Sequence, residues 1–378
     1  MARQMSWRPK SLAAFRKLLL RWFRANRRVH PWRRDRDPYR VWLAEVMLQQ
    51  TRIAAVIPYY DKFLERFPDV GALAKASEHD VLRHWAGLGY YSRARNLHRA
   101  AKEIVERHGG EFPRDLDAAL KLPGIGRYTA AAVLSIAYGA PYAVLDGNVA
   151  RVLGRLGVIR GDLRAPRQWQ LLAATAQELL AVDSAGDWNQ AMMELGETVC
   201  TPKSPNCEAC PVNGFCAALK RGLVNEIPEP RKKRSPLRQR IEAAVLLDPR
   251  GRTLLVRDPG AHDDVLFSRM WQFPAVQTTG NGGAELAKHL LDKYGFVPIV
   301  LTELALAKHC VTFRNITLAP FLARVSELPK IARSRALPLS ELNRVPISSA
   351  TRKIAAAALD AIDSGVTDRG RARNGRAS

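Results

Sequence analysis

The sequence contains no long uninterrupted run of apolar residues. The apolar stretch near the N-terminus, residues 12–23, is broken by arginines and by Lys17, which predicts an amphipathic helix rather than a signal peptide. No other segment approaches the roughly 20 apolar residues that a membrane-spanning helix needs. We therefore expect a cytoplasmic protein that makes no use of a membrane.

Cysteine is also scarce, with five residues in a chain of 378. An odd number does not build a simple disulfide framework, and four of the five lie between residues 200 and 216. Crowding of this kind is typical of a metal or cluster site in a reducing compartment. The fifth, Cys310, is expected as a buried strand residue with no chemical role.

Acidic residues are few compared with basic ones. The chain has 36 Asp and Glu against 59 Lys and Arg, which gives a formal net charge of +23. Such an excess says nothing about the fold, but it favours a polyanionic partner such as nucleic acid. A soluble basic protein without such a partner would show the same excess. The predominance of arginine, whose planar guanidinium binds phosphate through two hydrogen bonds, tilts the balance toward nucleic acid.

Apolar residues recur at the helical period throughout residues 1–226, and strand patterns are weak there. A Pro- and Arg-rich stretch at residues 227–237 is typical of a linker. Residues 238–362 predict an α+β domain, and residues 363–378 a basic disordered tail. Helices are expected at residues 11–25, 39–51, 53–67, 77–85, 93–108, 116–122, 128–138, 148–157, 168–180, 189–200 and 284–294, and strands at 241–247, 253–256 and 316–325.

Cys200, Cys207, Cys210 and Cys216 follow the spacing C-x6-C-x2-C-x5-C. Four thiolates in one short loop can close around a single metal centre, and both zinc and a 4Fe–4S cluster are physically allowed. Zinc sites usually pair two C-x2–4-C knuckles, and only Cys207 and Cys210 form one here. The larger sulfur frame of a cubane tolerates the unequal spacing, so we favour a 4Fe–4S cluster in a structural or DNA-positioning role.

The segment LPGIGR, residues 122–127, joins two predicted helices. Gly124 and Gly126 allow a tight turn and a close approach of the backbone to a ligand. The free amides of the turn and the positive end of the next helix would then face outward as an anion site, with Arg127 beside it. A plain helix–helix turn would need neither the proline before the first glycine nor the arginine after the second, so we predict a phosphate-binding hairpin.

A DNA-binding protein that takes a base out of the duplex needs a side chain to fill the gap that the base leaves. The segment GLGYY, residues 87–91, combines glycines with aromatic residues and is followed by arginines, which makes Tyr90 a candidate wedge. Leu48 and Gln50 are further candidates. For each of the three residues, packing in the core is an equally good explanation.

Glu45 and Asp146 are the carboxylates with the strongest functional context. Glu45 has Val41, Trp42 and Leu48 as neighbours at helical spacing, so burial should raise its pKa and make it a usable general acid. Asp146 precedes a helix, as an N-cap residue would. A rigid carboxylate is also what stabilises the positive charge that develops on a sugar when an N-glycosidic bond breaks. An exposed glutamate and a simple helix cap are the plainer alternatives.

These motifs resemble those of the adenine DNA glycosylases of the MutY type, within the helix-hairpin-helix superfamily that includes endonuclease III. The resemblance extends over nearly the whole chain and is carried by AEVMLQQT at residues 44–51, GLGYY at 87–91, the hairpin at 123–129, LDGNV at 145–149 and the cysteine loop. It implies a monofunctional glycosylase of base excision repair that removes adenine opposite 8-oxoguanine or guanine. It also implies a mainly α helix-hairpin-helix domain, a Nudix-like α+β domain, duplex DNA as partner, and a monomer located at the nucleoid.

By the same resemblance, Glu45 protonates adenine at N7 and later handles water, and Asp146 stabilises the oxocarbenium ion or its covalent adduct. Tyr128 and Asn148 would support the sugar and Asp146. Gln50 and Tyr90 would lie at the estranged guanine. The base pocket would be lined by Arg28, Trp32, Arg33 and Gln190.

Position 128 separates related activities. Endonuclease III-like enzymes, which also cut the strand, carry a lysine there that forms a Schiff base, and Tyr128 cannot form that imine. Thymine glycosylases for G·T mismatches also have a tyrosine, but they lack a large second domain. An iron–sulfur protein that only binds DNA would need neither Glu45 nor Asp146.

The segment RMWQFP, residues 269–274, resembles a Nudix-type element. Nudix hydrolases bind magnesium through a helix with several glutamates, whereas residues 284–294 offer only Glu285 and Asp292, so a recognition role is expected instead. In the family resembled, a Phe-Ser-His loop reads 8-oxoguanine. The matching residues Val311, Thr312 and Phe313 keep only the hydroxyl of Thr312, which we expect to contact the oxidised base.

Overall fold

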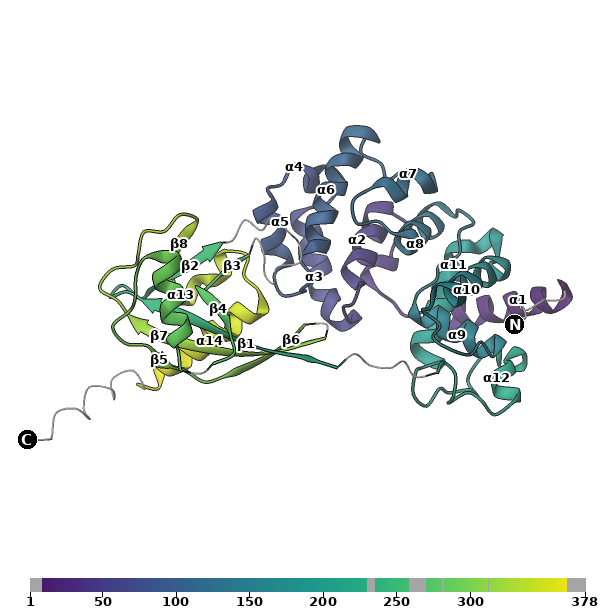
Figure 1. The fold of residues 1–378 in the computed structure, drawn as a ribbon. Coiled ribbons are helices and arrows are strands. Elements are labelled where there is room, and N and C mark those ends of the chain that lie inside the picture. Colours follow the sequence, from purple (N-terminus) through teal and green to yellow (C-terminus); the bar gives the residue numbers. More distant parts are fainter. Residues whose placement is uncertain (1–8, 230–234, 258–269, 281, 312, 366–378) are drawn as a thin grey trace, which may run out of the picture. The chain divides into compact units, whose positions relative to one another are not determined.

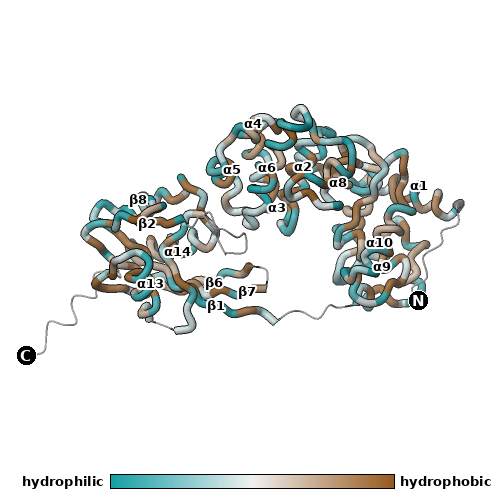
Figure 2. The backbone as a smooth tube through the Cα atoms, turned by 45° about the horizontal axis from the view of Figure 1, so that its top comes forward, coloured by the Kyte–Doolittle hydropathy of each residue, from teal (hydrophilic) through white to brown (hydrophobic). Residues whose placement is uncertain are grey.

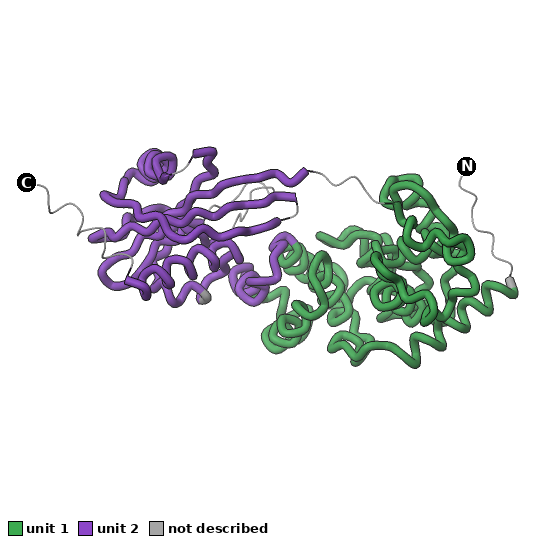
Figure 3. Tube along the Cα trace, turned by 90° about the horizontal axis from the view of Figure 1, so that it is seen from below, with its two compact units in different colours: residues 1–76, 93–232 green, residues 77–92, 233–378 purple. Residues whose placement is uncertain are grey.

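The computed structural model describes residues 9–229, 235–257, 270–280, 282–311 and 313–365. The chain divides into two compact units, one formed by residues 1–76 and 93–232 and the other by residues 77–92 and 233–378 (Figure 3). The sequence gives no indication that residues 77–92 belong to the second unit. No helix in the described ranges is long and apolar enough to cross a membrane.

The first unit is helical, and its described residues contain no strand (Figure 1). The helix expected at 39–51 ends three residues early, because Gln49 leaves helical geometry and Gln50 has a φ of 58°. A π-helical turn, Leu195–Val199, extends the last long helix toward Cys200. The helices are α1 (Pro9–Asn26), α2 (Pro38–Leu48), α3 (Ile53–Arg66), α4 (Val70–Lys75), α6 (Ser92–Arg107), α7 (Leu116–Lys121), α8 (Arg127–Tyr138), α9 (Gly147–Gly157), α10 (Pro166–Leu179), α11 (Ala185–Glu194) and α12 (Ala217–Lys220).

Helix α1 is held in the core of the first unit by one apolar face. Phe15, Leu19 and Phe23 follow one another at four-residue spacing and are fully buried. The ring of Phe15 meets that of Trp188 on α11 edge to face, with centroids 5.7 Å apart. In Figure 2, apolar and polar segments alternate along helices such as α3 and α10, as expected for helices with one buried face. This packing fixes α11, which carries one wall of the cavity described below.

The second unit is an α+β unit built on a mixed sheet, as the sequence predicted. The strands follow the order β3-β2-β1-β7-β5, with β4 paired to β1, β6 to β7 and β8 to β2. The long strands β1 and β7 run parallel, in a register that pairs Leu237 with Arg314. The elements are α5 (Glu78–Trp85), β1 (Leu237–Leu247), β2 (Arg252–Arg257), β3 (Trp271–Gln272), β4 (Ala275–Thr278), α13 (Ala284–Tyr294), β5 (Thr302–Glu303), β6 (Ala307–Val311), β7 (Arg314–Arg324), β8 (Ser334–Pro338) and α14 (Ser349–Asp363).

Helices cover both faces of this sheet, because successive side chains of a strand point to opposite sides. Ala243 and Val245 of β1 pack in one apolar cluster with α14. Ala244 and Leu246, one residue further along, pack in another cluster with α13. The sequence pattern predicted α13 at its observed bounds but gave no helix at α14.

Residues 77–92 are attached to the second unit by specific contacts. The hydroxyl of Tyr91 donates a hydrogen bond to the carbonyl of Ile347 (3.2 Å), and Nη2 of Arg352 donates one to the carbonyl of Ala86 (3.1 Å). Tyr90, between these anchors, has a φ of 47°. The loop with the candidate wedge therefore depends on residues near the far end of the chain.

One expectation for the second unit is wrong, and others lie outside the described residues. Cys310 does lie in a strand, β6, but its side chain is exposed and not buried. The alternation of the strand turns His309 inward instead, with 8% exposure. The expectation for Thr312, and that for all but the first three residues of the tail predicted at 363–378, concern residues that the structure does not describe. Asp363 is the last residue of α14.

Candidate active site and iron–sulfur site

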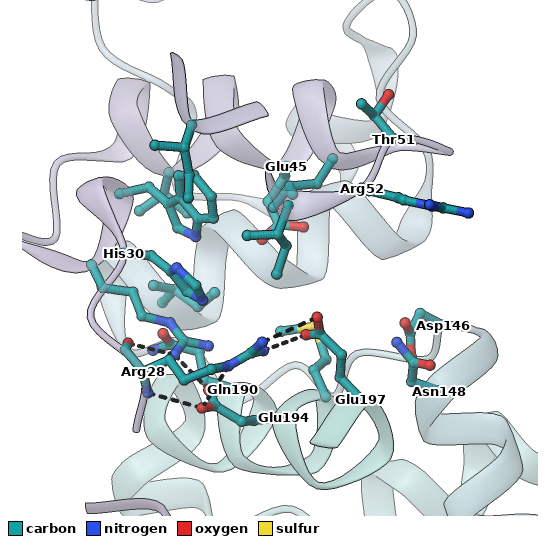
Figure 4. Close-up of a pocket in the computed structure, with 18 of the residues that line it drawn as sticks. Arg28, His30, Glu45, Thr51, Arg52, Asp146, Asn148, Gln190, Glu194 and Glu197 are labelled. Carbon is teal, nitrogen blue, oxygen red and sulfur yellow. Dashed lines mark hydrogen bonds and ion pairs between the residues drawn. The ribbon is translucent and has the colours of Figure 1, made fainter. Parts of the chain in front are cut away.

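A cavity of about 660 Å³ in the first unit is lined by α2, α8, α11 and the start of α9 (Figure 4). It brings together side chains that are more than a hundred residues apart in the sequence. Glu45 lies on one wall, and Asp146 and Asn148 lie on the wall opposite the Arg28 side chain. The sequence-predicted residues that line it are Arg28, Trp32, Arg33, Glu45, Leu48, Tyr128, Asp146, Asn148 and Gln190.

Glu45 is buried on α2, with 7% of its surface exposed. Burial raises the pKa of Glu45 to about 7, and the negative charge of Asp146 also raises it. The hydrogen bond from Tyr128 and the positive charge of Arg33 act in the opposite direction and lower it. The Tyr128 hydroxyl donates to Oε2 of Glu45 across 2.7 Å. A carboxyl group with this pKa is protonated in a large fraction of molecules at neutral pH, so it can act as a general acid.

Asp146 is the N-cap of α9 and also faces the cavity. Its Oδ1 accepts a hydrogen bond from the backbone N–H of Val149 (2.7 Å). Burial raises the pKa of Asp146, while the backbone amides of Val149 and Asn148 lower it by binding the carboxylate form. The predicted N-cap is therefore confirmed, and it holds the carboxylate at the cavity wall.

An ion-pair cluster forms the floor of the cavity beside Gln190, and two of its members were missed in the sequence. Glu194 is 2% exposed and accepts hydrogen bonds from the backbone N–H of Arg28 (2.9 Å) and from Nη1 of Arg33 (2.5 Å). Burial opposes ionisation of Glu194, but these two partners outweigh it and lower its pKa. Glu197 pairs with Nη2 of Arg28 at 2.5 Å. The partners are 161 to 169 residues apart, so no local pattern reveals the cluster.

The 122–127 turn is a tight connection between α7 and α8, as the sequence predicted. Gly124 has a φ of 76°, and a Cβ there would lie 2.5 Å from the Cβ of Asn96. Gly126 is the N-cap of α8, has no heavy atom within 4 Å of an added Cβ, and is exposed together with Arg127. The first glycine is therefore required by the fold, whereas the second leaves open space at a helix N-terminus.

The candidate wedge residues lie in different settings. Leu48 is half-buried and lines the cavity. Gln50 is exposed directly after α2. Tyr90 is half-buried and lies in the second unit. Their roles at an estranged base remain predictions.

The four loop cysteines line one small pocket, next to Arg155 of α9. Four thiolates around one pocket can hold either a zinc ion or the larger frame of a cubane cluster. Burial raises the pKa of the Cys210 thiol to about 11. A bound metal cation would favour its thiolate. Nη1 of Arg155 donates to Sγ of Cys200 across 3.2 Å.

Arg151 joins the cysteine loop to the cavity. Its Nε donates to the carbonyl of Cys200 (2.8 Å), and its Nη2 donates to Oδ1 of Asn148 (2.9 Å) and to the carbonyl of Gly196 (2.7 Å). The side chain is 8% exposed. The metal loop therefore supports the helix whose N-cap is Asp146.

Comparison with known proteins agrees with this geometry. Residues 43–179 match the HhH-GPD superfamily of base excision DNA repair proteins. A solved thermostable thymine-DNA glycosylase is 30% identical, covers 56% of this chain and 98% of its own, and superposes with a TM-score of 0.52. The chain belongs to this superfamily. Residues 200–216 match the iron–sulfur binding domain of endonuclease III, so the four cysteines hold a 4Fe–4S cluster.

Within the superfamily, the chain is similar to adenine DNA glycosylases. That of Homo sapiens is 39% identical over 318 residues, which cover 70% of this chain and 58% of the human protein. That of Arabidopsis thaliana is 34% identical over 319 residues, covering 73% and 49%. The chain thus spans about half to six tenths of the length of these two relatives.

Proposed function

We propose that the chain is a monofunctional adenine DNA glycosylase that hydrolyses the N-glycosidic bond of adenine opposite 8-oxoguanine or guanine in duplex DNA. The observation that carries the proposal is the buried Glu45, with its pKa raised to about 7, in one cavity with Asp146. An acid for the leaving base and an anion for the sugar are the two groups that this reaction needs. Similarity to adenine DNA glycosylases over 70% of the chain supports the choice of base.

The reaction begins when the extruded adenine enters the cavity with its sugar beside Asp146. Glu45 gives its proton to N7, which makes the base a better leaving group. The carboxylate of Asp146 then stabilises the positive charge that develops on the sugar as the bond breaks. Ionised Glu45 accepts a proton from the water that attacks the sugar, so both groups return to their starting states.

The backbone of the DNA would remain intact. Strand cutting by a glycosylase of this superfamily requires an amine that forms an imine with the opened sugar. Tyr128 occupies the position after the hairpin arginine, and its hydroxyl donates to Glu45. No lysine lines the cavity among the described residues.

A thymine glycosylase for G·T mismatches is the second candidate. The observation that favours it is the 30% identity to a thymine-DNA glycosylase, which this chain matches over 98% of that protein's length. That match covers 56% of this chain, which leaves the second unit unaccounted for. We assign that unit to recognition of the oxidised guanine opposite the target adenine.

The resulting protein would be a monomer at the nucleoid of the cytoplasm, held to DNA by its excess of 23 positive charges.

Single-turnover cleavage of duplexes tests the proposal. Duplexes with A opposite 8-oxoguanine, A opposite G and T opposite G are incubated with excess protein, and half of each sample is treated with alkali. We expect strand breaks after alkali only, and only in the two duplexes with adenine. Breaks without alkali would instead support a lyase, and release of thymine would support the second candidate.

A further inference from the structure

His30 is a buried polar residue of the cavity that neither the ion-pair cluster nor the acid–base pair uses. Its side chain lies against the cavity and has 6% of its surface exposed. Neither Nδ1 nor Nε2 has a hydrogen-bond partner in the described part of the chain. A buried polar atom without a partner is costly, and a specific one in a native protein calls for an explanation.

The ring of His30 is positioned by stacking. It lies against the indole of Trp32, with centroids 4.9 Å apart and planes 19° from parallel. Trp32 is in turn braced edge to face by Tyr60 at 5.5 Å. Rotation about the last torsion of a histidine is soft, so the stacked ring can turn one nitrogen into the cavity when a ligand arrives.

The charge state of His30 suits a neutral ligand. Burial, and then the positive charges of Arg33 and Arg28, lower its pKa. The ring is therefore uncharged at neutral pH and has one nitrogen that donates and one that accepts a hydrogen bond. The neighbouring guanidinium groups of Arg28 and Arg33 can only donate.

The place of His30 indicates which edge of a base it would meet. Figure 4 shows Asp146 on one side of the cavity, Glu45 between, and His30 on the other side. In the proposed reaction the sugar and N9 of adenine lie beside Asp146. The six-membered ring is the part of a purine farthest from N9, so the amino group at C6 points toward His30. That amino group is the hydrogen-bond donor of adenine and requires an acceptor, which the arginines lack.

We propose that His30 is a specificity-determining residue that accepts a hydrogen bond from the 6-amino group of the extruded adenine. This inference rests on the proposed function and adds to it a residue that recognises the base. Loss of one hydrogen bond should cost about tenfold in the preference for adenine.

The test compares two substrates in each of three proteins, all loaded with the cluster. Duplexes carry, opposite 8-oxoguanine, either adenine or unsubstituted purine, which lacks the 6-amino group. Single-turnover rate constants are measured for the wild type, His30→Leu and His30→Gln. The intrinsic reactivities of the two bases cancel when the adenine-to-purine ratio is compared between proteins. We expect this ratio to fall roughly tenfold in His30→Leu and to remain within about threefold of wild type in His30→Gln, which keeps an acceptor.

Other outcomes separate the inference from the proposed function. An unchanged ratio in His30→Leu overturns the role of His30 while adenine release by the wild type still upholds the function. If both variants show an equal decrease in the rate constant on both substrates, His30 has only a structural role, and the inference is again overturned. Gln190→Leu is measured in addition, because Gln190 is an uncharged polar side chain of the same cavity that could accept the same hydrogen bond. A drop in the ratio confined to Gln190→Leu assigns the amino group to Gln190 instead. Absence of adenine release by the wild type refutes the proposed function itself.

Discussion

The hydroxyl of Tyr128 lies 2.7 Å from Oε2 of Glu45 and donates a hydrogen bond to it. A proton held by Glu45 is therefore on Oε1, the oxygen that Tyr128 does not occupy. Burial raises the pKa of Tyr128 well above its usual value, so the phenol stays protonated and remains a donor. In the proposed reaction, Tyr128 would therefore orient the proton of the general acid Glu45.

Replacement of Glu45 by glutamine should abolish base release and spare DNA binding. Glutamine keeps the shape and the polarity of the site but carries no transferable proton, and general acid catalysis is worth about a hundred- to ten-thousandfold. Single-turnover rates and binding to the same duplex provide the two readouts. Glu65→Gln, at an exposed glutamate of α3, is the matched control and should behave as wild type. Retained activity in Glu45→Gln would remove this residue from its role.

Base release should become slower as the pH rises through about 7. The active form of Glu45 is the protonated one, and its pKa in the folded protein is raised to about 7. Activity is therefore present below this pH and falls about tenfold per pH unit above it. Single-turnover rates from pH 5 to 9 at constant ionic strength measure the profile. A rate that rises with pH in this range would contradict the assignment of Glu45 as the acid.

Tyr128→Phe should move that falling limb to higher pH. The hydrogen bond from Tyr128 lowers the pKa of Glu45, so its removal leaves burial less opposed. The comparison is made in the same pH series, with thermal unfolding as a check on the fold. An unshifted limb would mean that the hydrogen bond does not control the acid.

The two hairpin glycines should respond differently to alanine. Gly124→Ala places a Cβ 2.5 Å from that of Asn96 at a φ of 76°, and strain of this kind costs about 1–3 kcal/mol of stability. Gly126→Ala meets no neighbouring atom, so the melting temperature should hardly change. The added methyl nevertheless stands where a phosphate would approach α8, and affinity for duplex DNA should fall several-fold. Unchanged affinity in a stable Gly126→Ala protein would argue against the phosphate site.

Cys207→Ser should deprive the protein of its cluster, whereas Cys310→Ser should not. Cys207 lines the pocket of the four loop cysteines, while Cys310 is an exposed residue of β6. About four iron atoms per chain are expected in the wild type and in Cys310→Ser. Iron content and visible absorbance measure the difference. Stoichiometric zinc in a colourless wild-type protein would overturn the cluster.

Sequence patterns were sufficient for features that depend on neighbours along the chain. The apolar context of Glu45, the N-cap at Asp146 and the tight turn at Gly124 are all local, and the sequence predicts each of them. The helical period also located α13 at its observed bounds. Local physical chemistry dictates these elements, so a single sequence reveals them.

Features that depend on distant residues were not predictable. The ion pair between Arg33 and Glu194 joins residues 161 positions apart, and neither residue type is unusual in its own helix. The lack of hydrogen-bond partners at His30 within the described residues depends on segments that only the fold brings together around it. Helix α14 was also missed, because its run of alanines gives only a weak apolar stripe in the sequence. In the fold, this stripe packs against β1, and that packing stabilises the helix.

The attachment of residues 77–92 to the second unit sets an order of events during synthesis. The hydrogen bond between Tyr91 and Ile347 spans 256 positions. At about 5–20 residues per second, a ribosome needs roughly 13 to 51 seconds to pass from one to the other. Within that interval the ribosome synthesises the rest of the cavity lining and the whole cysteine loop. The segment that carries Tyr90 therefore receives its hydrogen bonds with Ile347 and Arg352 late in synthesis, and a chain that ends before residue 347 would lack both of them.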